Sequence, residues 1–298
     1  MTVINTNISA NIARDAIGRN DRAMATSMER LSTGLRINSA KDDAAGLAIA
    51  NRMAGQISGL NMAARNANDA ISMVQTVEGA SKEIGSMLVR MRELAVQSAS
   101  GTYSQSDRAA LQLEFDELGL EITRIQENTK WNDIALLDTA RTQTDTKINI
   151  QLGASSGQTM SLSFKDWSLT NAAPTVAGTE SVYGVNLAAS ATFRIYSSTN
   201  AATSISEASD TIDTLDTAIT GVTSEQAKYG AYLSRLQHAS DNISNVATNL
   251  DQSRSRIQDA DYAVETTELA RTQIIAQAST AMLAQANQVK QTVLALLQ

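Results

Sequence analysis

The chain has 298 residues, few aromatic residues, no cysteine and a formal net charge of −7 at pH 7. The acidic balance argues against nucleic acid as a partner, and the lack of cysteine excludes disulfides and thiol metal sites. Abundant alanine and a single proline, Pro174, favour long helices packed on small residues over a β-sandwich or barrel.

The first predicted helix ends at Gly34, because glycine readily adopts the left-handed conformation that closes helices. The N-terminal sequence lacks a basic segment followed by an apolar core, so no cleavable signal peptide is expected. After an irregular connector, Asp42 and Asp43 should open the next helix, where the helix dipole favours an anion. Apolar residues at roughly helical spacing mark the first helix: Ile4, Ile8, Ile12, Met24, Met28, Leu31 and Leu35.

A second predicted helix spans residues 45–99 and would be roughly 80 Å long at about 1.5 Å per residue. Its apolar residues repeat as in a coiled coil, with Ser81 as a polar gap. One seam consists of Met53, Leu60, Ala67, Val74, Leu88 and Ala95. The other consists of Ala50, Ile57, Ala64 and Ile71, and slips by one position to Val77, Ile84 and Met91, as helices drift against a heptad.

A shorter helix is predicted after a turn. Its N-cap is Ser104 or Ser106, and Asp107 lies in its first turn. Apolar residues step along it by three and four positions: Leu111, Phe115, Leu118, Ile122 and Ile125.

Residues from about 140 to 202 differ in kind from the rest of the chain. Serine, threonine, alanine, asparagine and glycine dominate, and short alternating runs predict strands at 147–152, 160–164 and 193–196. An insertion between two coiled-coil arms should lie at the distal tip of the arms. The two chain termini should then meet at the other end.

The C-terminal part of the chain is again helical in pattern. After Glu268 the only charged residues are Arg271 and Lys290, while glutamine and asparagine recur, so the tail fits neither a membrane span nor a solvated surface helix. The heptad positions that precede it are Ala208, Leu215, Val222, Tyr229, Leu236, Ile243, Leu250 and Ile257.

The sequence offers little catalytic chemistry. The sole histidine, His238, lies in the heptad helix without cysteine or carboxylate residues at metal-ligand spacing. Asp42 and Asp43 could be imagined as an acid/base pair, but no pocket is predicted around them. No phosphate-binding loop or zinc-protease motif is present. We therefore expect no enzyme activity, no metal and no cofactor.

Four stretches resemble bacterial flagellin: "INTNISANIARDAIGRN", "MERLSTGLRINSAKDDAAGLAIANRM", "MRELAVQSASGTYSQSDR" and the final segment from "SRIQDADYAVETTELAR" to the end. The resemblance covers about the first 140 and the last 95 residues, in the same order and spacing. It implies a mainly α, long antiparallel helical hairpin or coiled-coil bundle with both termini paired and a small β-rich insertion at the distal tip.

The resemblance also implies a division into domains and a function. Residues 1–44 and 255–298 would form an inner coiled coil, residues 45–144 and 203–254 a helical bundle, and residues 145–202 a variable outer insertion. The chain would be a structural subunit that polymerises into the extracellular flagellar filament for swimming motility. The flagellar type III apparatus would export it unfolded.

In such a filament the terminal helices line a channel, and the tail has two faces that suit this position. The face expected to pack against neighbouring helices includes Ile274, Ala278, Met282, Ala286, Val289, Val293 and Leu296, with Ile4, Ile8, Ile12 and Leu31 contributed by the first helix. The opposite face, expected to border the channel, includes Gln277, Thr280, Asn287, Gln291 and Gln298.

Partners follow from the same resemblance. They are further copies of the chain, an export chaperone at the C-terminal segment, and the filament cap and hook-associated proteins. Arg90, Leu94 and Glu114 match positions at which the vertebrate Toll-like receptor reads flagellin. They could equally form an axial contact between subunits. Val89 and Met91 stand where recognised members have glutamine and valine.

Two other functions remain open at this point. A hook–filament junction protein resembles flagellin at both ends, although the small insertion favours flagellin. A surface adhesin or glycan-binding module could act through residues 145–202.

Overall fold

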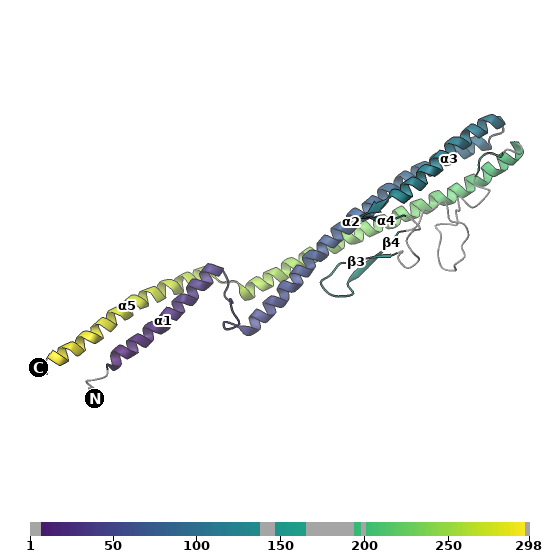
Figure 1. The fold of residues 1–298 in the computed structure, drawn as a ribbon. Helices are drawn as coiled ribbons and strands as arrows, with labels where there is room; N and C mark the ends of the chain where they lie inside the picture. Colours follow the sequence, from purple (N-terminus) through teal and green to yellow (C-terminus); the bar gives the residue numbers. More distant parts are fainter. Residues whose placement is uncertain (1–6, 138–146, 165–193, 198–200, 296–298) are drawn as a thin grey trace. The chain divides into compact units, whose positions relative to one another are not determined.

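The computed structural model describes residues 7–137, 147–164, 194–197 and 201–295. Its helices and strands confirm a mainly α fold with a small β-rich insertion (Figure 1). The helices are α1 (Ile8–Thr33), α2 (Ala44–Ala99), α3 (Gln105–Asn128), α4 (Ala201–Gln258) and α5 (Tyr262–Ala295). The strands are β1 (Lys130–Trp131), β2 (Ile134–Ala135), β3 (Lys147–Gln151) and β4 (Thr159–Ser163), paired antiparallel as β1–β2 and β3–β4.

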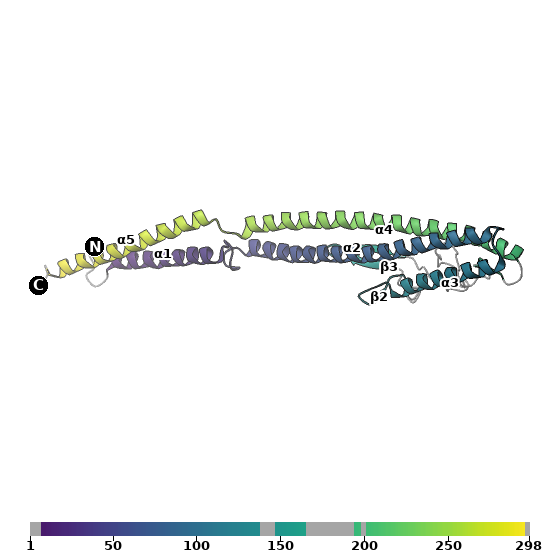
Figure 2. The same cartoon turned by 90° about the horizontal axis from the view of Figure 1, so that it is seen from above.

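The chain divides into two compact units, each made from both halves of the sequence. One contains residues 1–58 and 246–298, and the other contains residues 59–245. In the first unit, α1 and α5 lie side by side and antiparallel (Figures 1 and 2). The N-terminal and C-terminal segments are therefore paired, as predicted.

In the first unit, α1 ends at Gly34 and α2 begins after Asp43, as predicted. Gly34 caps α1 with a φ of 73°, and its N–H donates to the Arg30 carbonyl. Its own carbonyl accepts from the N–H of Ala260, beside an antiparallel bridge between Leu35 and Asp259. Asp43 opens α2, because its carboxylate accepts hydrogen bonds from the N–H groups of residues 45 and 46. Both linking segments are therefore held to each other by backbone hydrogen bonds.

The core of the second unit is the predicted heptad seam. Residues of α2 and α4 alternate in it, and α3 packs on the same cluster through Phe115 and Ile122. Ser104 is the N-cap of α3, where it forms a reciprocal capping box with Asp107. The buried heptad members of this unit are Ala67, Val74, Val77, Ile84, Leu88, Met91 and Ala95 on α2, and Ala208, Leu215, Val222, Tyr229, Leu236 and Ile243 on α4.

The polar gap of that seam, Ser81, is fully buried between α2 and α4. Its hydroxyl has no hydrogen-bond partner among the described residues. Ser81→Ala should therefore raise the free energy of unfolding by about 1 kcal/mol more than Ser86→Ala, since an unsatisfied buried hydroxyl is costly. Ser86 is the matched control because it is exposed on the same helix. Denaturant unfolding of both variants checks this. A smaller gain for Ser81→Ala than for Ser86→Ala would contradict it.

The β3–β4 hairpin lies against the helices through its apolar face. Phe164 packs on Tyr229 of α4 with ring centroids 5.8 Å apart. Asn66 of α2 donates to the Gln151 carbonyl at 3.2 Å, and a Cβ on Gly59 would lie 2.9 Å from the Cβ of Ala154. The described part of the insertion thus includes a hairpin along α2 and α4, where Gly59 permits its close approach.

The prediction of a strand at 193–196 is wrong for residues 194–196, which the structure describes. Arg194–Ser197 form no strand, and side chains of the helices bind their backbone instead. Ser98 donates to the Ile195 carbonyl, and the Ile195 N–H donates to Gln112 at 2.8 Å. The alternating pattern reflected the burial of Ile195 and Ser197, but the hydrogen-bond partners of this segment come from helices.

Candidate assembly surface

The α1–α5 pair is held together mainly by small and polar side chains. Asn20 of α1 is buried and donates to the Thr272 carbonyl of α5 at 2.8 Å. Nearer the chain ends, Asn7 donates to the Ala286 carbonyl at 3.3 Å. The stripe of α5 that turns inward includes Glu265, Leu269, Thr272, Ala276, Ser279, Leu283 and Ala286, and the matching stripe of α1 includes Ala13, Asn20 and Ser27.

An ion pair links the C-terminal end of α1 to the N-terminal end of α5. Arg30 Nη1 lies 2.9 Å from Glu265 Oε1, and the side chains are 31% and 10% exposed respectively. Arg30 is in the last turn of α1 and Glu265 in the first turn of α5. Each charge therefore also complements the dipole of its own helix. Tyr262 adds a hydroxyl donor to the Leu31 carbonyl at 3.2 Å.

Sequence reasoning missed these residues because it searched for apolar periodicity. The signal was nevertheless present as a polar heptad. Asn20 and Ser27 are seven positions apart, and so are Glu265, Thr272 and Ser279. A heptad of small polar residues can also define a helix pair.

The residues predicted to pack against neighbouring helices mostly face away from this seam. Ile8, Ile12, Ile274 and Met282 are exposed in the single chain. Ala278 is also exposed, whereas Leu31 and Ala286 are half-buried. Ile4 and Leu296 lie outside the described residues, and α5 includes Val289 and Val293 without described side chains. The apolar face is therefore available to other molecules.

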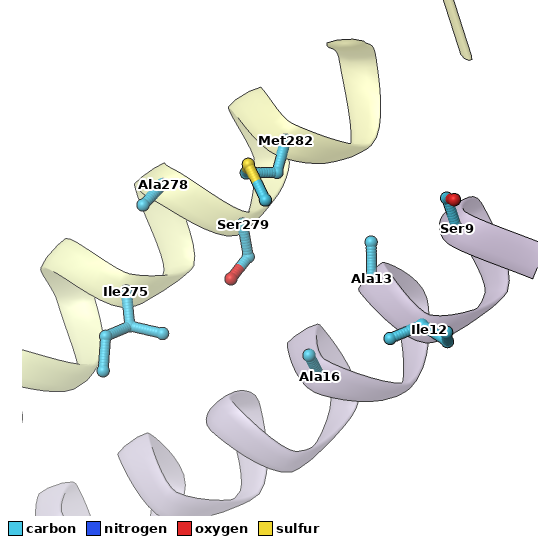
Figure 3. Close-up of a pocket in the computed structure, with 8 residues that line it drawn as sticks. All are labelled: Ser9, Ile12, Ala13, Ala16, Ile275, Ala278, Ser279 and Met282. Carbon is cyan, nitrogen blue, oxygen red and sulfur yellow. The ribbon is translucent and has the colours of Figure 1, made fainter. Parts of the chain in front are cut away.

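An apolar groove of about 430 Å³ runs between α1 and α5 beside this face. Figure 3 shows Ile12 and Ala13 of α1 opposite Met282 and Ile275 of α5. Ala16, Ala278 and the hydroxyls of Ser9 and Ser279 complete the lining. Among the described residues, no charged side chain lines the groove.

The residues predicted to border a channel lie on another side of α5. Gln277, Thr280 and Asn287 are exposed, and the side chains of Gln291 and Gln298 lie outside the described residues. Asn287 also reaches α1, because its Oδ1 accepts from Asn7 at 3.4 Å. On a helical projection the inward stripe lies between the predicted packing face and the predicted channel face.

The predicted receptor residues are brought together only in part. Arg90 and Glu114 are exposed and 2.8 Å apart across α2 and α3, and Arg90 also pairs with Glu93 at 3.0 Å. These carboxylates raise the pKa of the Arg90 guanidinium above its ordinary value, so it stays charged. Leu94 is 1% exposed and belongs to the core. It cannot offer its side chain to a partner in this conformation.

Other candidate chemistry is dispersed. His238 is exposed on α4. Asp42 was expected to open the next helix together with Asp43, but it lies in the connector, where it accepts hydrogen bonds from Ser39 and Asn38 that hold the pKa of its carboxyl below the usual value. Within the described ranges, no group of histidine and carboxylate residues is arranged to hold a metal ion. Nor is any described helix long and apolar enough to cross a membrane.

Comparisons with known proteins agree with this arrangement. The sequence profile of the bacterial flagellin N-terminal helical region matches residues 4–142, and that of the C-terminal helical region matches residues 212–297. The chain is 42% identical over 295 residues to a flagellin of Halalkalibacterium halodurans, and 40% identical over 308 residues to a flagellin of Bacillus subtilis. Each alignment covers 99% of both sequences. A putative flagellar hook-associated protein from Vibrio parahaemolyticus shares the fold, with a TM-score of 0.57 at 13% identity over 73% of this chain and 100% of that one.

Proposed function

The chain belongs to the bacterial flagellin family, and from this membership we infer how its copies assemble, leave the cell and are recognised. As a flagellin it is a structural subunit of the extracellular flagellar filament and not an enzyme. Its principal partner is therefore another copy of the same chain.

We propose that the exposed apolar face of α1 and α5 is the surface on which neighbouring copies pack. The observation that supports this most is the uncovered groove around Ile12 and Met282. Burying such a face releases about 25 cal/mol per Å² of apolar surface, repeated at every subunit. Residues 1–44 and 255–298 would form the inner part of the filament, residues 45–144 and 203–254 the middle, and residues 145–202 the outside.

The uncharged polar side of α5 supports a second role in the assembled state. Gln277, Thr280 and Asn287 would border the central channel together with Gln291. Amides and hydroxyls hydrate such a wall without fixed charges that would hold a passing chain.

The experiment that tests assembly is electron microscopy of the purified protein after heating, cooling and addition of salt. Long helical filaments are the expected result. Discrete particles would argue against the proposed polymer, and glycan affinity of such particles would favour the adhesin alternative. Full-length identities with flagellins favour a filament subunit over a hook–filament junction protein.

Export is proposed to use the flagellar type III apparatus, with a chaperone covering the C-terminal segment beforehand. The supporting observation is the exposure of Ile274, Ile275 and Met282, since exposed apolar patches are adhesive in the cytoplasm. The growing filament would also contact the cap and hook-associated proteins at its ends.

We further propose that Arg90 and Glu114 contribute to recognition by the vertebrate Toll-like receptor. Arg90→Ala removes a charge-assisted hydrogen-bond donor from this surface. The monomer should therefore need roughly ten-fold more protein to activate the receptor. Receptor signalling assays measure this, with Arg124→Ala as control because Arg124 forms a similar exposed pair with Glu121. Equal potency of Arg90→Ala and Arg124→Ala would remove Arg90 from the recognition surface.

A further inference from the structure

The described methionine side chains range from exposed to fully buried, with Met24, Met53 and Met87 in between. Met282 is 69% exposed, Met28 56% and Met62 48%. Met73, Met91 and Met160 are buried in the core of the second unit. A thioether in water is open to peroxide, whereas a close-packed core shields its sulfur. The folded chain should therefore be oxidised selectively.

Met282 is distinguished from the other exposed methionines by its surroundings. It lines the apolar groove between α1 and α5, opposite Ile12 and Ala13 (Figure 3). Oxidation turns a flexible apolar side chain into a polar one. The new oxygen is a strong hydrogen-bond acceptor. Among the described side chains that line the groove, only the hydroxyls of Ser9 and Ser279 could donate to it.

We propose that Met282 is an oxidation site in the unassembled chain, and that its sulfoxide prevents packing of a second copy in the groove. This consequence rests on the assembly surface proposed above. Hydrogen peroxide transfers one oxygen atom to the sulfur, the peroxide O–O bond breaks, and water leaves. The sulfur is oxidised by two electrons and the peroxide is reduced by two. Assembly covers the thioether, so a filament protects a residue that the free subunit exposes.

Peptide mass spectrometry tests the first half of the proposal. Folded monomer treated with hydrogen peroxide should carry sulfoxide at Met282, Met28 and Met62 well before Met73 and Met91. In preformed filaments, the rate of sulfoxide formation at Met282 should be at least ten-fold lower than in the monomer. Equal oxidation of Met282 in monomer and filament would overturn the claim that assembly covers this side chain.

Assembly measurements test the second half, with each protein compared with its own untreated sample. Peroxide should raise the concentration needed for filament formation at least ten-fold in the wild-type chain, and methionine sulfoxide reductases should reverse the effect. Met282→Leu keeps an apolar side chain without a sulfur, so peroxide should change its assembly little. Met62→Leu should remain as sensitive as the wild type, because Met62 lies on α2 in the other unit.

The possible failures are distinguishable. If peroxide inhibits Met282→Leu as strongly as the wild type, another methionine is responsible and the proposal is wrong. If wild-type chain fully oxidised at Met282 assembles normally, the groove tolerates the sulfoxide, and the proposed block of assembly is wrong. If untreated protein forms no filaments at all, the proposed assembly fails, and the consequence assigned to the sulfoxide fails with it.

Discussion

Met282→Glu should abolish filament assembly while leaving the helices of residues 59–245 folded. In the free chain the new carboxylate would stay hydrated, because Met282 is exposed. In the filament it would enter an apolar groove lined by Ile12, Ile275 and Ala278. Burying an unpaired carboxylate costs several kcal/mol in every subunit, or forces protonation. The substitution therefore penalises the assembled state only.

Gln277→Glu is the matched control on the same helix. Gln277 is exposed and lies away from the groove, on the face proposed to border the channel. A carboxylate there should remain in water, so this variant should still polymerise. Circular dichroism reports whether both chains fold, and sedimentation reports whether they form filaments. Normal filaments from Met282→Glu would show that the groove does not face a neighbouring subunit.

The central helices could be predicted almost entirely from the sequence. Apolar side chains such as Val74, Leu88, Leu215 and Leu236 repeat every seven residues, and all four are buried. Two helix ends could also be predicted, because Gly34 and Ser104 occupy caps whose backbone geometry favours those residue types. These predictions depend on local rules and on one dominant force, burial of apolar surface.

The pairing of α1 with α5 was harder to predict in detail. The most apolar stripe of these helices is left exposed in the single chain, while Asn20, Ser27 and Thr272 are buried. Apolar periodicity identifies a face that some partner covers. It does not say whether that partner belongs to the same chain or to another copy. Hydrogen bonds such as the one from Asn20 to the Thr272 carbonyl specify the partner within the chain.

The segment around Ile195 shows a different limit. Its strand-like sequence predicted an extended backbone with a buried side chain, and Ile195 is indeed buried. A strand also needs a neighbouring strand to bond with. Here Ser98 and Gln112, far away in the sequence, supply those hydrogen bonds instead. Short-range patterns carry no information about such distant side-chain partners.

Arg30→Met should loosen the α1–α5 pair more than the loss of a surface ion pair would. The change leaves Glu265 largely buried without its cation, and it removes a positive charge from the last turn of α1. Breaking a fully buried pair costs about 3–5 kcal/mol. We expect about 2–3 kcal/mol, because Arg30 is partly exposed and the α5 dipole still stabilises Glu265. Hydrogen exchange of α5 amides should therefore speed up roughly 30- to 150-fold in the monomer.

Two further variants separate the buried pair from an ordinary charge effect. Arg271→Met removes a cation from α5 whose pair with Glu268 is exposed, so its exchange rates should change by a factor of about three or less. The double variant Arg30→Met with Glu265→Met removes both charges, and most of the protection should return because no buried carboxylate is left unpaired. If Arg30→Met and Arg271→Met had the same exchange rates, the Arg30–Glu265 pair would stabilise the α1–α5 contact no more than an exposed ion pair does. Faster amide exchange in the double variant than in Arg30→Met alone would also contradict the prediction. The two methionines would then join the helices less well than an unpaired Glu265 does.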